Sequence, residues 1–505
     1  MMISMKRRLS LLVCLLVISS SYANSRLDIV ESTVTNYLKK PTGQYGVGFQ
    51  DFHWVNQAAC PDVNFNGKNQ ADFSPANIKH CHEIVARIYY PVTKKGQHSA
   101  YYEPFVKQQQ QVLKQDSNIS AEQLAQLSQI NSYSAQDVNI VSNQLFPVLI
   151  FAPGLGWSAQ VYENLITELT SQGYIVIGVN SPFINLVALP DGHVVDLPPM
   201  KSPDEIDKNI VPLQKQDLSY IYALIHDSHH LNSIFSSMDL SHIGIFGHSI
   251  GGRNIADIIH AHPDWFQAGV SLDIGFDKSN ESRKKFNIPF MHEICSNRTL
   301  ASNDIPVTFE LGKNGYLVGI SPNENDYSYS FHGNFADYST LQYSPAFLEF
   351  TSYLKKQMMD VKFDIKIMSH VLTDLEINKF SNQTYVLVYT DGQWYGSIYL
   401  NKNKLTDFDV NKMHNLRAAL DVLPCNSVDK PSDSQMASIK TEITQLHGIL
   451  SNPIGVGNGF EISTAINAYT VNFFDMYLKG RTNPAFNNCT PLVTNTYIKC
   501  GPGIY

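Results

Sequence analysis

Positive charge and long apolar runs are both scarce in this chain of 505 residues. It holds 37 Lys and Arg against 45 Asp and Glu, which gives a formal net charge of −8 at pH 7. Binding to nucleic acid or to an anionic membrane surface favours the opposite balance. After residue 23, no stretch approaches the roughly eighteen apolar residues of a membrane-spanning helix. These absences argue against a nucleic-acid partner and against a membrane span in the body of the chain.

The main apolar stretch lies at the N-terminus and predicts an export signal. Lys6-Arg7-Arg8 is basic, residues 9–18 are mostly apolar, and Ser21-Tyr22-Ala23 has the small residues of a cleavage site. The apolar part is too short to span a bilayer. We therefore expect residues 1–23 to be removed and the protein to be periplasmic or secreted. Those residues hold three basic and no acidic side chains, so the net charge would change from −8 to −11.

Cysteines are few, and their number suggests disulfides. Of the seven, Cys14 would leave with the signal, and an even number in an exported chain favours pairing. Pairing neighbours along the chain would join the remaining six as Cys60–Cys81, Cys489–Cys500 and Cys295–Cys425. Other connectivities of six cysteines stay open.

Apolar strands alternate with amphipathic helices from Phe146 onward, after two opening strands at 45–52 and 84–90. Expected strands cover residues 147–151, 174–179, 243–246, 268–273, 288–294 and 305–311. Expected helices cover residues 162–169, 204–231, 250–262 and 345–358. This rhythm predicts an α/β fold with a mostly parallel sheet and helices on both faces.

Three regions follow the export signal. Residues 41–358 form the expected α/β core, with a Gln- and Ser-rich surface insertion at 99–143. A lid or a lipid contact is the alternative role for that insertion. Residues 359–455 break the rhythm and contain a β-hairpin signal around Asp391-Gly392, so we expect an inserted subdomain there. Residues 456–505 would return with an amphipathic helix at 463–478 and end in a tail.

The segment 247–251, Gly-His-Ser-Ile-Gly, joins an apolar strand to a helix. Strand, sharp turn and helix with a serine at the apex form the nucleophile-elbow pattern G-x-S-x-G. Glycines on either side of the serine let the helix pass close to the strand. We therefore predict that Ser249 is a nucleophile; a tight turn without chemistry is the alternative.

A serine nucleophile needs a base and an acid that orients the base, in the chain order Ser, Asp, His for this fold. Asp273 ends the strand after the elbow helix, with Asp277 as the alternative acid. His332 lies in a loop after the later strands and is the expected base. His292 lies within an apolar strand, where a core histidine is expected, and His370 lies in the inserted region.

The oxyanion of an acyl-transfer reaction needs two backbone N–H donors. One is expected from Ile250, directly after the nucleophile, and the other from Leu155 in the Gly154-Leu155-Gly156 turn that follows an early strand. Glycines beside Leu155 allow the backbone to turn toward a substrate.

These motifs together resemble the plasma-type platelet-activating-factor acetylhydrolases, which are secreted, calcium-independent phospholipases A2 of the α/β-hydrolase fold. The likeness covers roughly residues 41–350 and 463–479, and its most specific part is His-Gly-Asn-Phe-Ala-Asp at 332–337. It implies that Ser249 is the nucleophile, Asp273 the acid, His332 the base, and Leu155 and Ile250 the oxyanion donors. Ala152-Pro153 and Asn180-Ser181-Pro182 depart from the family pattern and leave the substrate open.

The expected function is hydrolysis of carboxylic esters, with short or oxidised sn-2 acyl chains of phospholipids as the implied substrates. No metal or organic cofactor is required. The partners would be a phospholipid or small ester and, transiently, a lipid interface; the oligomeric state is open. A general carboxylesterase or lipase, including a polyester hydrolase, is one alternative. A binding protein that keeps the fold without catalysis is another.

Overall fold

The computed structural model describes most of the expected core. It covers residues 37–56, 82–93, 130–190, 194–195, 211–227, 232–274, 281–295, 308–323, 329–341, 343, 383–390, 393–401 and 457–505. In this part of the chain no helix is long and apolar enough to cross a bilayer. The export signal, Cys60, Cys81, Cys425, the helix expected at 345–358 and most of the two insertions lie outside the described residues.

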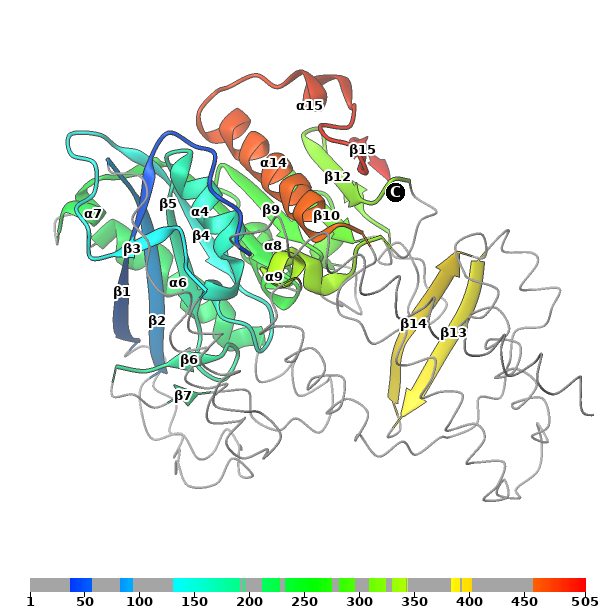
Figure 1. The fold of residues 1–505 in the computed structure, drawn as a ribbon, viewed down its shortest axis with the longest axis horizontal. Coiled ribbons are helices and arrows are strands. Elements are labelled where there is room, and N and C mark those ends of the chain that lie inside the picture. Colours follow the sequence, from blue (N-terminus) through cyan, green and yellow to red (C-terminus); the bar gives the residue numbers. More distant parts are fainter. Residues whose placement is uncertain are drawn as a thin grey trace, which may run out of the picture.

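Ten strands form one sheet in the order β15-β12-β10-β9-β8-β4-β5-β2-β1-β3 (Figure 1). They are β1 (Gly46–Asn56), β2 (His82–Val92), β3 (Ser134–Gln136), β4 (Phe146–Ala152), β5 (Ile175–Asn180), β8 (Met238–His248), β9 (Ala268–Leu272), β10 (Phe290–Cys295), β12 (Gly315–Ile320) and β15 (Tyr497–Cys500). Neighbours from β5 through β12 are parallel. β2 is antiparallel to both β1 and β5, and β15 is antiparallel to β12. The predicted mostly parallel sheet is confirmed.

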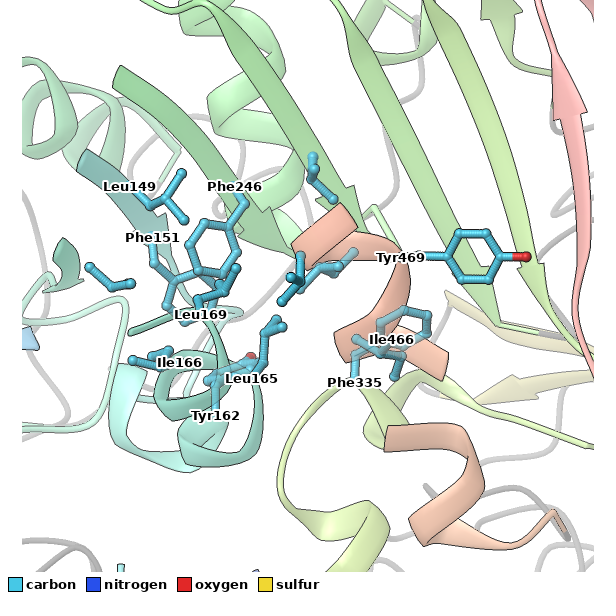
Figure 2. Close-up of a cluster of buried hydrophobic side chains, with 14 of the residues drawn as sticks. Leu149, Phe151, Tyr162, Leu165, Ile166, Leu169, Phe246, Phe335, Ile466 and Tyr469 are labelled. Carbon is cyan, nitrogen blue, oxygen red and sulfur yellow. The ribbon is translucent and has the colours of Figure 1, made fainter. Parts of the chain in front are cut away.

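Side chains of the parallel strands alternate between two apolar layers, because successive residues of a strand point to opposite faces. Leu149 and Phe151 of β4 pack with helices α4 (Glu163–Ser171) and α14 (Gly459–Leu478), as Figure 2 shows. Val148 and Ile150 belong to the layer that contains α6 (Val211–Asp227) and α8 (Ile250–Ala261). Burial on both faces explains why these strands are continuous apolar runs in the sequence.

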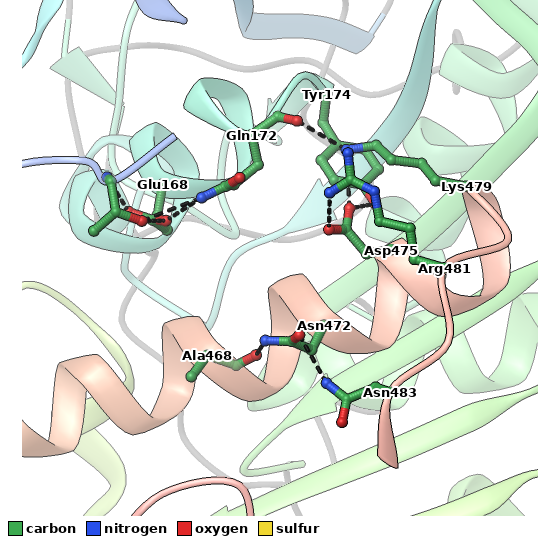
Figure 3. Close-up of polar contacts among 10 residues, drawn as sticks. Glu168, Gln172, Tyr174, Ala468, Asn472, Asp475, Lys479, Arg481 and Asn483 are labelled. Carbon is green, nitrogen blue, oxygen red and sulfur yellow. Dashed lines mark hydrogen bonds and ion pairs between the residues drawn. The ribbon is translucent and has the colours of Figure 1, made fainter. Parts of the chain in front are cut away.

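Helix α14 is fastened at its C-terminal end to the turn between α4 and β5 (Figure 3). The Tyr174 hydroxyl donates to Asp475 Oδ1 at 2.8 Å, and Lys479 Nζ donates to the Gln172 carbonyl at 2.9 Å. Arg481 also pairs with Asp475, with 2.6 Å between Nη1 and Oδ2. The helix predicted at 463–478 therefore exists and packs on the core, about three hundred residues away from α4 in the chain.

Two edge elements differ from the sequence prediction. Of the strand expected at 305–311, residues 308–311 are described, and among them β11 (Glu310–Leu311) pairs with β16 (Gly503–Ile504) outside the main sheet. The last parallel strand is instead β12, a short apolar run that contains two glycines and gives a weak pattern. The C-terminal tail adds β15 to the sheet, and a Cys489–Cys500 disulfide, as predicted, joins its end to α15. Cys295 is buried in β10, and its predicted partner Cys425 lies outside the described residues.

The remaining elements are short or lie apart from the sheet. They are η2 (Ala159–Tyr162), β6 (Val187–Ala188), β7 (Val194–Val195), α7 (Ser233–Ser236), η4 (Glu281–Arg283), η5 (His332–Phe335), α9 (Tyr338–Leu341) and α15 (Pro484–Asn488). Strands β13 (Gln383–Thr390) and β14 (Gln393–Asn401) pair antiparallel, so the hairpin expected around Asp391-Gly392 is confirmed. The helix expected at 204–231 is described as α6, and its first residues lie outside the described part.

Candidate active site

Ser249 occupies the sharp turn between β8 and α8. Its φ of 56° and ψ of −121° place a non-glycine residue in a region that costs free energy, as expected at a nucleophile elbow. The turn is tight on all sides. A Cβ added to Gly251 would come within 2.1 Å of the Ala152 carbonyl oxygen, and one added to Gly247 would lie 2.5 Å from the Gly251 carbonyl carbon. Both glycines are therefore required by close backbone approach, as the sequence predicted.

Asp273 follows β9 and is fully buried, also with a positive φ, of 44°. Three hydrogen bonds hold it. Its backbone N–H donates to the Glu293 carbonyl at 2.6 Å, and its Oδ1 accepts from the Cys295 N–H at 3.1 Å. Its Oδ2 is hydrogen-bonded to His332 Nδ1. The carboxylate is thus fixed by strand β10 on one side and faces the expected base on the other.

His332 lies at the start of η5, and 38 % of its side chain is exposed. Its ring centroid is 4.3 Å from that of His248, the residue that precedes Ser249. The ring centroids of Trp157 and His332 are 6.2 Å apart. The imidazole of His332 therefore has aromatic side chains as neighbours beside the elbow. With Nδ1 bonded to Asp273, Nε2 is the nitrogen left to accept a proton, as the base of the predicted Ser-His-Asp triad would do.

The His-Gly-Asn-Phe-Ala-Asp motif fixes the position of His332. Asn334 Oδ1 accepts from the Phe331 N–H at 2.7 Å, which closes the turn around the histidine. Asp337 accepts from the Glu163 and Asn164 N–H groups, both at 2.8 Å, and so caps the N-terminus of α4 from another part of the chain. Phe335 is buried in the core (Figure 2). The motif therefore ties the loop of the expected base to the helix layer.

The predicted oxyanion loop approaches the elbow closely. A Cβ on Gly154 would lie 2.9 Å from His248 Nδ1 and 3.3 Å from Ser249 Cβ. The Gly156 N–H donates to the Ile184 carbonyl at 2.7 Å, so it is not a donor for a substrate. Within the described part of the chain, the N–H groups of Leu155 and Ile250 donate no hydrogen bond, and Ile250 is the first residue of α8. An N–H at that helix position has no intrahelical partner.

An apolar cluster borders these two donors. Ile184, Val211 and Ile250 form its buried centre, and the half-buried Leu155 and Leu213 pack against it. The side chains of both predicted oxyanion residues therefore belong to one apolar cluster, and Ile250 directly follows Ser249 in the chain.

Of the alternative residues for the acid and the base, the structure describes only His292. Asp277 and His370 lie outside the described residues. His292 is a buried core residue, as expected, and its Nδ1 lies 2.7 Å from Ser271 Oγ. Burial lowers the pKa of His292 to about 3, which leaves its imidazole neutral. The five predicted site residues, Ser249, Asp273, His332, Leu155 and Ile250, gather at the carboxyl ends of β4, β8 and β9. Their catalytic roles stay predictions.

Sequence analysis missed the polar side chains that surround the oxyanion loop, chiefly Tyr162, Gln214 and Asn254. In the sequence, Tyr162 is only the first residue of the helix expected at 162–169. Gln214 and Asn254 are buried among apolar neighbours on α6 and α8. A polar residue at a helix position that should face the core was the available signal, since buried polar groups require hydrogen-bond partners.

Comparison with known proteins supports the family resemblance. Residues 30–181 match the family model "Platelet-activating factor acetylhydrolase, isoform II", which confirms the resemblance over the opening strands and the oxyanion loop. No curated protein matches the chain. Among solved structures, a ferulic acid esterase from Streptomyces cinnamoneus superimposes with a TM-score of 0.53 at 13% identity, over 92% of this chain and 99% of that one. This likeness concerns the fold, which is that of the α/β-hydrolases. The family match and the site geometry support an ester hydrolase.

Proposed function

We propose that the chain is a serine hydrolase of carboxylic esters, with Ser249 as nucleophile, His332 as base and Asp273 as the orienting acid. The observation that carries this proposal is the hydrogen bond between His332 Nδ1 and the buried Asp273 carboxylate, beside an elbow that presents Ser249. Further support comes from the chain order Ser, Asp, His, which is that of this fold, and from the contact between Asp273 and His332, which lie in separate loops.

The reaction follows from these positions. The Ser249 hydroxyl attacks the ester carbonyl carbon while His332 Nε2 takes its proton, and Asp273 stabilises the imidazolium that forms. The Leu155 and Ile250 N–H groups would stabilise the oxyanion of the tetrahedral intermediate. The proton then passes to the leaving alcohol, and an acyl group remains on Ser249. Water activated by His332 hydrolyses this acyl-enzyme and restores the serine.

The finer proposal is that the substrates are phospholipids with short or oxidised sn-2 acyl chains. Support comes from the family match over residues 30–181 and from the apolar cluster beside the predicted oxyanion donors. Export by the sequence at residues 1–23 stays a prediction, because those residues lie outside the described part.

Replacing the nucleophile tests the proposed chemistry. Ser249→Ala is expected to abolish hydrolysis of p-nitrophenyl acetate and covalent labelling by a fluorophosphonate, because no other group could carry the acyl chain. The matched control is Ser241→Ala, which removes an exposed hydroxyl from the same strand β8 and should leave both unchanged. Full activity or full labelling in Ser249→Ala would refute the assignment.

A further inference from the structure

The loop that carries Leu155 is held by buried polar side chains from separate elements. The Tyr162 hydroxyl accepts from the Gly154 N–H at 3.3 Å, and Asn185 Nδ2 donates to the Gly154 carbonyl at 2.9 Å. Gln214 Nε2 donates to the Pro153 carbonyl at 3.1 Å. Three side chains therefore fix the two peptide units that precede Leu155.

Two of these side chains also connect the loop to the elbow. The Tyr162 hydroxyl lies 2.8 Å from His248 Nδ1, and His248 is bonded covalently to Ser249. Because this hydroxyl already accepts from Gly154, its own proton is available for Nδ1. On the helix side, Asn254 Nδ2 of α8 donates to Gln214 Oε1 at 2.7 Å. The loop is thus joined to residues on both sides of the nucleophile.

All of these hydrogen bonds are buried, so water cannot replace a lost partner. Tyr162, Asn185, Gln214, His248 and Asn254 are each at most 1% exposed. A buried polar group that loses its hydrogen-bond partner destabilises the folded protein, so the loop is held in the position that satisfies all of these groups. Burial also raises the pKa of Tyr162 well above its usual value, which keeps the hydroxyl protonated and able to donate.

We propose that Tyr162 is a positioning residue for the oxyanion hole. Its hydroxyl, shared between the Gly154 N–H and His248 Nδ1, sets the distance between the oxyanion loop and the elbow. That distance determines how the Leu155 and Ile250 N–H groups converge on one oxygen. This role rests on the proposed function, because it requires an oxyanion to form next to Ser249.

The consequence is specific to the transition state. Oxyanion donors act when they lie about 2.7–3.1 Å from the developing charge, and loss of one donor costs about 10²–10³ in kcat. Loosening the loop should cost less than losing a donor outright. We expect about a tenfold fall in kcat with little change in KM, because the charge that these donors stabilise develops only in the transition state.

The test is Tyr162→Phe, which removes one oxygen atom. kcat and KM are measured for an ester and for the matching thionoester, whose C=S group is a poorer hydrogen-bond acceptor. The preference for the oxygen ester should fall about as much as kcat does, because it reports the oxyanion hole. The matched control is Tyr174→Phe. Tyr174 is equally buried, but its hydroxyl donates to Asp475 next to the N-terminal end of β5, whereas Ser249 follows the carboxyl end of β8. The preference of Tyr174→Phe for the oxygen ester should therefore equal that of wild type.

A Tyr162→Phe protein that loses activity but keeps the wild-type preference would overturn the proposal and leave a purely structural role. Should that variant fail to fold, His248→Asn and His248→Leu give the same test. The Asn oxygen can replace Nδ1 as acceptor, so His248→Asn should keep more of the preference than His248→Leu, and equal values would overturn the proposal. Absence of Ser249-dependent hydrolysis in the wild type would instead refute the proposed function itself.

Discussion

Ser249 and Asp273 both have a positive φ, of 56° and 44°, at the carboxyl ends of the adjacent strands β8 and β9. Each such conformation costs about 1–3 kcal/mol in a non-glycine residue. Backbone hydrogen bonds maintain both: the Ser249 N–H donates to the Leu272 carbonyl at 3.0 Å, and the Asp273 N–H donates to the Glu293 carbonyl. The neighbouring strand in each case holds the turn, so the parallel sheet itself stabilises the strained residues of the proposed triad.

The role of Asp273 can be separated from that of Asp277. Asp273→Asn should lower kcat for p-nitrophenyl acetate by about 10⁴, because an amide at this position favours the wrong tautomer of His332. The measurement is steady-state hydrolysis by protein that is confirmed as folded by its circular dichroism spectrum. Asp277→Asn is the matched control and should stay near wild-type activity. The reverse pattern would show that Asp277 is the acid.

At the scale of elements, strand β10 supports the proposed acid while carrying an unusual side chain of its own. Glu293 is fully buried, and its Oε1 accepts from the Thr470 hydroxyl of α14 at 2.7 Å. Burial raises its pKa well above the usual value of 4.5. The folded protein therefore keeps this carboxyl protonated at pH values where the unfolded chain has released the proton.

This difference predicts how stability depends on pH. Between pH 4.5 and the raised pKa, the folded state binds one more proton than the unfolded state, so the free energy of unfolding falls as pH rises, by about 1.4 kcal/mol per unit. Glu293→Gln removes the titrating group and keeps the shape. The variant should therefore melt higher than wild type at pH 8 and close to wild type at pH 4, by differential scanning calorimetry. A difference in melting temperature that does not grow with pH would contradict the raised pKa.

The opposing titration of His292 does not disturb that comparison. Its pKa is lowered to about 3, so it contributes stability that is lost as pH falls from about 6.5 toward 3. Because His292 is present in both proteins, its contribution largely cancels in the difference between them.

Elements differ in how well the sequence predicts them. Strands β4, β5, β8 and β9 were predictable because burial on both faces demands continuous apolar runs. β12 and β15 were not, since β12 is short with glycines at 315 and 319, and β15 depends on its pairing with β12 and on the Cys489–Cys500 disulfide. On α6, Gln214 is fully buried and its side chain is hydrogen-bonded to the Pro153 carbonyl and to Asn254, whereas the neighbouring Leu213 is only half-buried. Apolar periodicity cannot show such polar partners.

For the whole molecule, the chain leaves the described core at Tyr343 and returns at Gly457 in the same place. The Tyr343 hydroxyl accepts from the Gly459 N–H at 3.0 Å, and its ring stacks on that of Phe460 with centroids 5.6 Å apart. The Gly457 N–H donates to the Tyr329 carbonyl at 2.8 Å. The long segment between them therefore begins and ends at neighbouring points, as an inserted unit would.

We predict that the core does not need the inserted region 359–455. Replacement of these residues by about six Gly and Ser residues should leave a folded protein that a fluorophosphonate still labels at Ser249, because the remaining residues and a short linker have only to join Tyr343 to the neighbouring residue Gly457. Labelling and the melting temperature are compared with those of the full chain. Aggregated protein, or folded protein without labelling, would show that residues 359–455 belong to the core or the site.

The sequence predicted the proposed triad better than its surroundings. Ser249, Asp273 and His332 could be chosen from the motif and the strand pattern, and the structure brings Asp273 and His332 into contact, while their catalytic roles stay predictions. The polar side chains that hold Gly154 come from η2, α6 and the segment before β6, and only the folded chain brings them together.

The most direct test of the central claim is hydrolysis of a defined set of esters without calcium, with Ser249→Ala as control. The set contains phosphatidylcholines with sn-2 chains from acetyl to palmitoyl and soluble p-nitrophenyl esters. We predict Ser249-dependent turnover that is fastest for the short sn-2 phospholipids. Turnover of soluble esters alone would keep the triad and refute the phospholipid substrate, and no Ser249-dependent turnover of any ester would contradict the proposed function.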